Sequence, residues 1–283
     1  MSNTETNRLL GYPADARLLL INADDFGMHR AINEAIFRAL KHGLVRSTTL
    51  MVPCPGASHA IQWLGRQADI PFGVHLTVIR DTVNDEYGPL TPREEAPSLI
   101  DETGHFYSFE RMAEFFAHVR LDELETELRA QIEAVLAAGL KPTHLDWHSL
   151  RLVGRTDIFD VMFGLAREYG LAQRVVGRHS IEQVQRQGLP VNDYDFLDSS
   201  SLDLAGKSAR YVQLLRALPA GLSEWAVHPG LDSAELRAMQ PTLAKIRQTD
   251  FDFLMSQEAK DVVQEEGIIL VDYRPLQYVW RGA

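Results

Sequence analysis

The sequence predicts an α/β fold of one domain in which parallel strands alternate with helices. This is either an eight-fold (β/α) barrel or a distorted relative of one, with a doubly wound open sheet as the alternative. Short apolar runs alternate with longer amphipathic patterns about eight times along the chain. The length of 283 residues suits one such barrel. No internal repeat, low-complexity tract or linker divides the chain.

The predicted strands are short apolar or β-branched stretches that end in proline, glycine or polar residues. The first spans residues 17–24, and its run of leucine and isoleucine is typical of a parallel strand buried on both faces. The remaining predicted strands are residues 47–52, 72–78, 143–148, 173–176, 194–199, 223–228 and 268–272.

The predicted helices lie between these strands, at residues 29–42, 121–138, 155–170, 208–218 and across 232–266. The clearest is 121–138, where apolar residues recur along one face, while Glu125 and Arg129 are placed to pair on the other. The predicted apolar face consists of Leu121, Leu124, Leu128, Ile132 and Leu136, and Gly139 ends the helix.

The stretch 80–108 contains three prolines and many acidic residues and lacks strong periodicity. A loop this long in a compact domain is usually functional or mobile, so we expect it to form a flap that contributes to substrate choice. We assign residues 17–283 to one domain and residues 1–16 to an N-terminal extension.

Composition excludes several classes of protein. The net charge of −11 and a pI of about 5.4 argue against binding to nucleic acids or to anionic membranes. Cys54 is the sole cysteine, which excludes an intramolecular disulfide, and we expect it to be a small buried residue rather than a nucleophile. The polar stretch 1–17 does not resemble a signal peptide and no run is long enough to span a membrane. We therefore expect a cytoplasmic protein and leave a homodimer open.

Ionisable residues gather at the carboxyl ends of the predicted strands, where α/β folds bind ligands. Asp24 and Asp25 end the first strand, and His75 lies on the third. In the strand 143–148, alternation places three ionisable residues on one face, namely His144, Asp146 and His148. One aspartate with two histidines is a common set of ligands for Zn, Fe, Co or Ni. On these residues alone, two structural roles stay open. Asp25 could cap the following helix, and His75 could be a core histidine with its hydrogen bonds satisfied.

Five segments together resemble the YdjC/ChbG-type carbohydrate deacetylases. They are Asn22-Ala23-Asp24-Asp25-Phe26-Gly27, Ser47-Thr48-Thr49-Leu50-Met51-Val52, Gly73-Val74-His75-Leu76, Pro142-Thr143-His144-Leu145-Asp146-Trp147-His148 and His228-Pro229-Gly230. The resemblance extends from about residue 17 to 275. It implies a distorted TIM-like (β/α) barrel that removes an N-acetyl group from an amino sugar, such as a chitooligosaccharide. It also implies one divalent metal ion, Zn or Mg.

The resemblance assigns roles to particular residues. It implies that Asp25, His75 and His148 are the metal ligands, that Asp24 is the catalytic base and that His228 is the general acid. The chemistry agrees, because hydrolysis of an amide needs a base for the water and an acid for the leaving amine.

Three further residues, His144, Asp146 and Arg174, are candidates for supporting or substrate-contacting roles. Arg174 matches an arginine that follows the fifth strand in many members, and Asp146 is placed to orient His144 or His148. One departure concerns the residues after His148, where Ser149-Leu150-Arg151-Leu152 stands in place of a His-rich run. The three ligand positions are retained, so the departure affects the expected sugar subsite and not the metal site.

Two other functions are considered. A 2-His-1-carboxylate Fe(II) enzyme would use the same ligand types, but it leaves the second aspartate and His228 without a role. A sugar-binding relative without catalysis would need neither the base nor the acid. For the aromatic residues, Trp147 is expected in the core. Tyr87, Phe106 and Tyr107 are either sugar platforms or local hydrophobic anchors.

Overall fold

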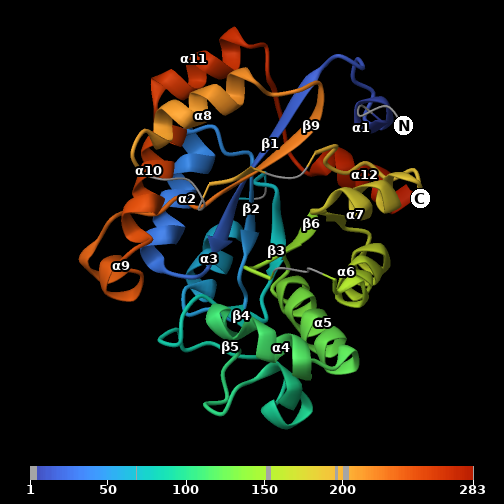
Figure 1. Ribbon diagram of the computed structural model, residues 1–283, viewed down its shortest axis with the longest axis vertical. Helices are drawn as coiled ribbons and strands as arrows, with labels where there is room; N and C mark the ends of the chain where they lie inside the picture. The colour runs from blue at the N-terminus through green and yellow to red at the C-terminus, as the bar shows by residue number, and fades with distance from the viewer. Residues whose placement is uncertain (1–4, 68, 151–153, 195–196, 200–203, 283) are drawn as a thin grey trace.

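The protein folds as a curled parallel sheet that forms a half-barrel flanked by helices (Figure 1). The computed structural model describes residues 5–67, 69–150, 154–194, 197–199 and 204–282. The main sheet has eight strands in the order β7-β6-β3-β2-β1-β9-β8, and β10 also pairs with β1. Every pairing within it is parallel. The predicted distorted TIM-like barrel is therefore confirmed.

Each strand of the main sheet overlaps one of the predicted stretches. The strands are β1 (Arg17–Phe26), β2 (Ser47–Leu50), β3 (Phe72–Leu76), β6 (His144–Trp147), β7 (Ala172–Gln173), β8 (Leu197–Asp198), β9 (Gly221–Val227) and β10 (Ile269–Val271). Residues 195 and 196 of the predicted strand 194–199 lie outside the described residues. A separate pair is formed by β4 (Ile79–Arg80) and β5 (Tyr107–Ser108).

The sheet departs from a regular barrel at β1, which pairs with three strands. One edge of β1 pairs with β9 along most of its length. The other edge is shared, because residues 18–20 pair with β10 whereas the pairing with β2 begins at Asn22. Within the described ranges, β7 and β8 end the sheet and do not pair with each other. The sheet thus curls without closing.

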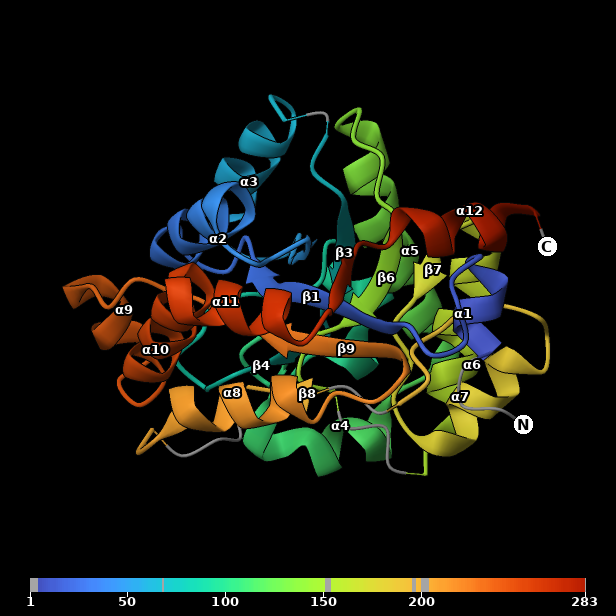
Figure 2. The same cartoon turned by 90° about the horizontal axis from the view of Figure 1, so that it is seen from above.

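Helices surround the strands in two views at right angles (Figures 1 and 2). They are α1 (Glu5–Leu9), α2 (Arg30–His42), α3 (Ala57–Leu64), α4 (Met112–His118), α5 (Leu121–Ala137), α6 (Thr156–Tyr169), α7 (Arg178–Gln185), α8 (Lys207–Arg216), α9 (Ala234–Met239), α10 (Ala244–Met255), α11 (Gln257–Glu265) and α12 (Arg274–Gly282). The predicted helical stretch 232–266 is thus three helices. Over the part of the chain that is described, no helix combines the length and the apolarity that a membrane span requires.

Helix α5 follows the predicted apolar face as far as Ile132. Beyond it, Val135 is buried while Leu136 is 41% exposed, so the prediction for Leu136 was wrong. A helix turns every 3.6 residues, so a core-facing stripe cannot advance by four residues indefinitely. The predicted pair is present, with Arg129 Nη2 donating to Glu125 Oε1 at 3.0 Å.

The segment 80–108 is folded around the buried side chain of Arg80. This guanidinium donates to the carbonyl of Asp85 at 2.7 Å and to the carbonyl of Val83 at 3.1 Å. It also donates to the carbonyl of Phe106 and pairs with the Asp101 carboxylate. The segment contains the 3-10 turns Arg93–Glu95 and Pro97–Leu99 as well as β5. It therefore has an internal structure that its lack of periodicity did not indicate.

The aromatic residues of this segment are hydrophobic anchors and not exposed platforms. Tyr87, Phe106 and Tyr107 are all buried in the core. Glu127 of α5 holds the same segment from outside, because its carboxylate accepts from the amides of Leu90 and Thr91 at 3.1 and 3.0 Å.

We expect Arg80→Ala to destabilise the protein by about 3–5 kcal/mol, the usual cost of removing one partner from a buried ion pair. The substitution leaves the Asp101 carboxylate without its buried cation and three carbonyls without a donor. Urea unfolding measures the loss, and limited proteolysis should locate it within residues 80–108. Arg93→Ala, at an exposed position in the same segment, is the control. Equal stability of the two variants would contradict this account of the segment.

Candidate active site

Except for His144, the site residues predicted from the sequence meet at the carboxyl ends of the strands. The strand alternation turns one face of each strand inward, and parallel pairing brings those faces together. The residues are Asp24 and Asp25 in β1, His75 in β3, Asp146 in β6, His148 directly after β6, Arg174 directly after β7 and His228 directly after β9.

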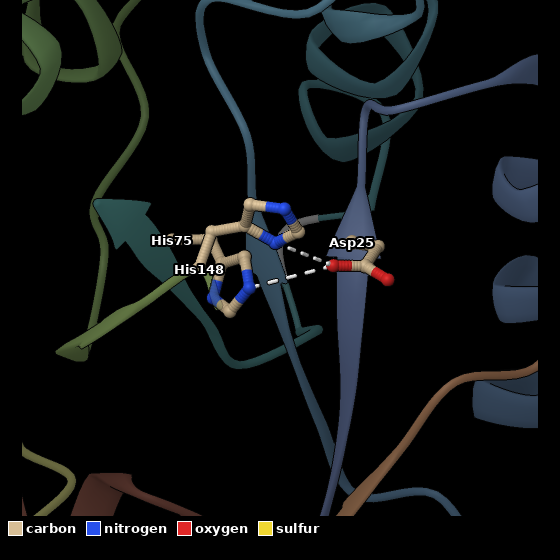
Figure 3. A group of neighbouring side chains, drawn as sticks. All are labelled: Asp25, His75 and His148. Atoms are coloured by element: carbon tan, nitrogen blue, oxygen red, sulfur yellow. Dashed lines mark hydrogen bonds and ion pairs between the residues drawn. The ribbon is translucent and has the colours of Figure 1, made fainter. Parts of the chain in front are cut away.

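Asp25, His75 and His148 form a compact buried group (Figure 3). Oδ1 of Asp25 lies 3.5 Å from Nε2 of His75 and 3.2 Å from Nδ1 of His148. One potential ligand atom from each residue lies within 4.8 Å of the others. Both imidazoles approach the same carboxylate oxygen, as Figure 3 shows. The three side chains can therefore hold one metal ion between them.

The other nitrogen of each imidazole faces a second carboxylate. Nδ1 of His75 lies 2.7 Å from Oδ1 of Asp146, and Nε2 of His148 lies 2.9 Å from Oδ1 of Asp81. The sequence had suggested that Asp146 orients His144 or His148. It contacts His75 instead, because the β3–β6 register places these two residues opposite each other.

These carboxylates govern the charge of the two histidines. Burial by itself would lower the pKa of His75, but the charge and hydrogen bond of Asp146, together with Asp25 and Asp24, outweigh burial and raise the pKa to about 10. Burial opposes the charge of Asp81 at His148 in the same way, and the pKa rises to about 9. Both imidazoles are therefore in the doubly protonated, positively charged form at neutral pH when no metal ion is bound.

Asp24 is held by Arg174. Nη1 and Nη2 of this arginine donate to Oδ2 and Oδ1 of Asp24 at 2.7 and 2.8 Å, and Asn22 Nδ2 donates to Oδ1 at 2.8 Å. Burial would raise the pKa of Asp24, but the charge of Arg174 overrides it and holds the pKa well below its usual range. Glu224 and Asp146 also contact the guanidinium, at 2.7 and 3.0 Å. Asp24 is thus ionised and fixed in orientation.

His228 faces Asp24 from the end of β9, with its Nε2 4.0 Å from Oδ2 of Asp24. Nδ1 of His228 lies 3.1 Å from the hydroxyl of Ser199, which donates to the carboxylate of Asp250. Asp250 also accepts from the His228 backbone amide at 3.0 Å and pairs with the buried Lys207 at 2.7 Å. With Nδ1 donating to Ser199, Nε2 is the atom that faces the site.

His144 lies apart from this group although it shares a strand face with Asp146. Its ring stacks on Tyr273 with 3.5 Å between centroids, and its Nδ1 is 2.9 Å from the hydroxyl of Thr143. Burial lowers its pKa well below the usual range, so the ring is neutral. The position of the His144 ring also explains why residue 73 is glycine, since a Cβ added there would lie 2.6 Å from the ring. Tyr273, Glu224 and Arg174 connect His144 to Asp24 through successive contacts.

Two charged residues that the sequence did not single out support the site from α10. Arg247 donates through Nη2 to Oδ2 of Asp25 at 2.7 Å, and Asp250 anchors His228. Arg247 and Asp250 share the buried face of α10 with Phe253 and Leu254. Charged residues on an otherwise apolar helix face are the signal that could have found them, because buried charges need partners.

Two expectations about neighbouring residues agree with the structure. Cys54 is buried, and burial raises the pKa of its thiol well above the usual range, as befits an unreactive residue. Trp147 packs against the core and donates to the carbonyl of Leu150 at 2.9 Å. Of the departing segment after His148, residues 151 and 152 lie outside the described residues.

Comparison with known proteins places this chain in a family. The sequence model of the YdjC-like protein family matches residues 18–265. A carbohydrate deacetylase of Enterococcus faecalis is 33% identical over 265 residues, which cover 91% of this chain and 97% of the relative. A chitooligosaccharide deacetylase of Serratia marcescens is 27% identical over 267 residues, which cover 92% of this chain and 99% of the relative.

The fold has a close counterpart among solved structures. A proposed cellobiose-phosphate cleavage protein of Enterococcus faecalis superposes with a TM-score of 0.79 at 31% identity, covering 92% of this chain and 99% of the other. The resemblance noted in the sequence is thus confirmed over nearly the whole chain. The family match spans both the half-barrel and the residues gathered at its carboxyl edge, and the chain belongs to the YdjC-like protein family.

Proposed function

We propose that this protein is a metal-dependent carbohydrate deacetylase that hydrolyses the N-acetyl group of an amino sugar or a short oligosaccharide. The observation that carries the proposal is the pairing of an ionised Asp24 with His228, 4.0 Å apart, beside the group of Asp25, His75 and His148. This arrangement supplies a base, an acid and a cation site in one place. The relatives named carbohydrate and chitooligosaccharide deacetylases support the same reaction class.

The group of Asp25, His75 and His148 suits a divalent ion. One carboxylate and two imidazoles surround a common point, and each imidazole has a carboxylate behind it, as metal-bound histidines usually do. Two nitrogen ligands favour Zn²⁺ over Mg²⁺, which prefers oxygen ligands. A bound ion would polarise the amide carbonyl and make the attacking water more acidic.

The protein's own residues carry the protons. Asp24 accepts a proton from the water whose oxygen attacks the acetyl carbon. The C–N bond then breaks, and Nε2 of protonated His228 gives a proton to the leaving nitrogen. The products are acetate and a free amino sugar. Arg174 keeps Asp24 ionised and correctly oriented before each turnover.

The two other functions considered from the sequence leave residues without a role. An Fe(II) enzyme with Asp25, His75 and His148 as ligands has no use for the Arg174–Asp24 pair. A binding protein has no use for an acid held by Ser199 and Asp250. We therefore place hydrolysis first.

Acetate release tests the proposal. The protein is incubated with N-acetylglucosamine, its β-1,4-linked oligomers and other N-acetylated sugars, with Zn²⁺, Mg²⁺ or a chelator, and acetate is measured with a coupled assay. We expect acetate from at least one sugar, loss of the activity with chelator and its return with metal. Binding of sugars without acetate from any of them would overturn the proposal in favour of a binding protein.

Metal binding should depend strongly on pH. Because His75 and His148 hold protons up to pKa values of about 10 and 9, a metal ion must displace both protons at neutral pH. The affinity for Zn²⁺ should therefore rise by about 100-fold per pH unit between pH 6 and 8, since about two protons leave per ion. Calorimetry in buffers of different ionisation enthalpy counts the protons. Binding without proton release would show that the imidazoles are neutral in the metal-free protein.

A further inference from the structure

A closed ring of polar contacts lies against the metal-binding group on its side facing α9 and α10. Asp81 Oδ1 is 2.9 Å from Nε2 of His148, and Asp81 Oδ2 accepts from Gln240 Nε2 at 2.8 Å. Gln240 Oε1 accepts from Arg247 Nε at 2.8 Å. Arg247 Nη2 donates to Oδ2 of Asp25 at 2.7 Å, and Oδ1 of Asp25 returns to His148 at 3.2 Å. The ring joins two of the candidate ligands through three residues that have no part in the proposed proton transfers.

The side chains of the ring are committed to one another. Gln240 and Arg247 are 2% and 3% exposed, so little of either faces solvent. Asp81 also accepts from the hydroxyl of Ser149 at 3.2 Å, which engages both of its oxygens. Separating the buried Arg247 guanidinium from the Asp25 carboxylate would cost free energy, because it would leave a buried charge without its partner. Arg247 therefore holds Asp25 in place.

We propose that Asp81, Gln240 and Arg247 are positioning residues. They determine which oxygen of Asp25 and which nitrogen of His148 face a metal ion. This inference rests on the proposed metal-dependent function. A carboxylate 2.9 Å from Nε2 of His148 disfavours a lone pair on that nitrogen, so Nε2 carries the proton and Nδ1 faces the ion. Arg247 occupies Oδ2 of Asp25, which leaves Oδ1 as the one oxygen for the ion.

The backbone supports this assignment. Among the described residues, two residues other than glycine have left-handed φ values, Asp25 at +67° and Ser149 at +51°. Such conformations are strained for residues other than glycine and persist where surrounding contacts enforce them. Asp25 is one member of the ring, and Ser149 directly follows another and bonds to Asp81. The strain is thus confined to the two chain segments that the ring holds.

The test measures the binding of Zn²⁺ and Co²⁺ alone to the full-length protein, by competition with a chromophoric chelator and by the absorption spectrum of the Co²⁺ form. Asp81→Ala should weaken Zn²⁺ binding about 10- to 100-fold and alter the Co²⁺ spectrum. Asp81→Asn should restore most of the affinity, because its amide oxygen still accepts from Nε2–H. Gln240→Ala, which keeps both charges, should give an intermediate loss.

Asp85→Ala is the matched control. Asp85 lies in the same segment, where its carboxylate accepts from the amide and the hydroxyl of Thr82 at 2.7 and 2.9 Å. It should lower the unfolding midpoint without changing metal affinity. If Asp81→Ala behaves like this control, with wild-type affinity and an unchanged Co²⁺ spectrum, the inference is wrong and Asp81 serves the segment only. If the wild-type protein binds neither ion, both the proposed metal-dependent function and this inference are wrong. If the wild type binds metal and releases acetate but Asp81→Ala has wild-type affinity, the proposed function stands and only this inference is wrong.

Discussion

Replacing Asp24 with asparagine should lower kcat by about 10² or more, the usual range for the loss of a general base. The amide cannot take the proton from the attacking water. The fold should survive, because the side chains have nearly the same shape and Arg174 keeps its contacts with Glu224 and Asp146. Metal content should also survive, since Asp25 and not Asp24 belongs to the group with His75 and His148.

The measurement combines steady-state acetate release with metal analysis of the purified variant. Asp15→Asn, at an exposed aspartate, is the matched control and should behave as wild type. If Asp24→Asn loses its metal together with its activity, then Asp24 is a ligand. A second group of potential ligand atoms, formed by Asp24, His75 and Asp146, would then be the metal site.

The charge of Asp24 also limits how activity depends on pH. Since Arg174 lowers its pKa, Asp24 stays ionised throughout the neutral range and loses its charge only below the pH at which ordinary aspartates do. A decline of kcat/KM between pH 8 and pH 5 should therefore come from protons competing with metal at His75 and His148. Saturating metal should shift that decline to lower pH, which a profile at two metal concentrations would reveal.

His228→Ala should lower kcat by about 10² or more, the usual range for the loss of a general acid. Only a protonated imidazole can give a proton to the leaving amine, and Nε2 is the nitrogen that faces Asp24 while Nδ1 contacts Ser199. Metal occupancy should not change, because His228 lies outside the group of Asp25, His75 and His148.

The control for this variant is His179→Ala, at an exposed histidine. His228→Gln is a second variant that retains a polar side chain near Ser199 and should be equally inactive. Activity of both variants near the wild-type level would show that another group protonates the amine. Loss of metal from His228→Ala would make His228 a ligand and require a different acid.

Local sequence was enough to predict the strands and to place acidic residues and histidines at their ends, whereas the family resemblance supplied the set of candidate ligands. Period-2 alternation determines which way Asp146 and His148 point, and a strand end determines where Asp24 and Asp25 lie. These relations act over a few residues, so they can be read without knowing the rest of the fold. The eight strands of the sheet and the residues at their carboxyl ends were predicted for this reason.

The partners of these residues depended on the tertiary structure. Arg247 contacts Asp25 across 222 positions, and Arg174 contacts Asp24 across 150. The buried face of α10 includes Arg247 and Asp250, so the helical pattern of apolar residues is weak there and cannot show what that face packs against. Segment 80–108 likewise gave no periodic signal, because Arg80 organises it through backbone carbonyls, which every residue has.

The sequence by itself therefore determined a curled α/β fold with acids and histidines at one edge of its sheet. The tertiary structure decided which of them are ionised and how each is oriented. The physical reason is that a buried charge is set by the groups within a few ångströms of it. For Asp25, His148 and His228 those groups come from helices and loops far away in the chain, and their docking is a property of the whole core.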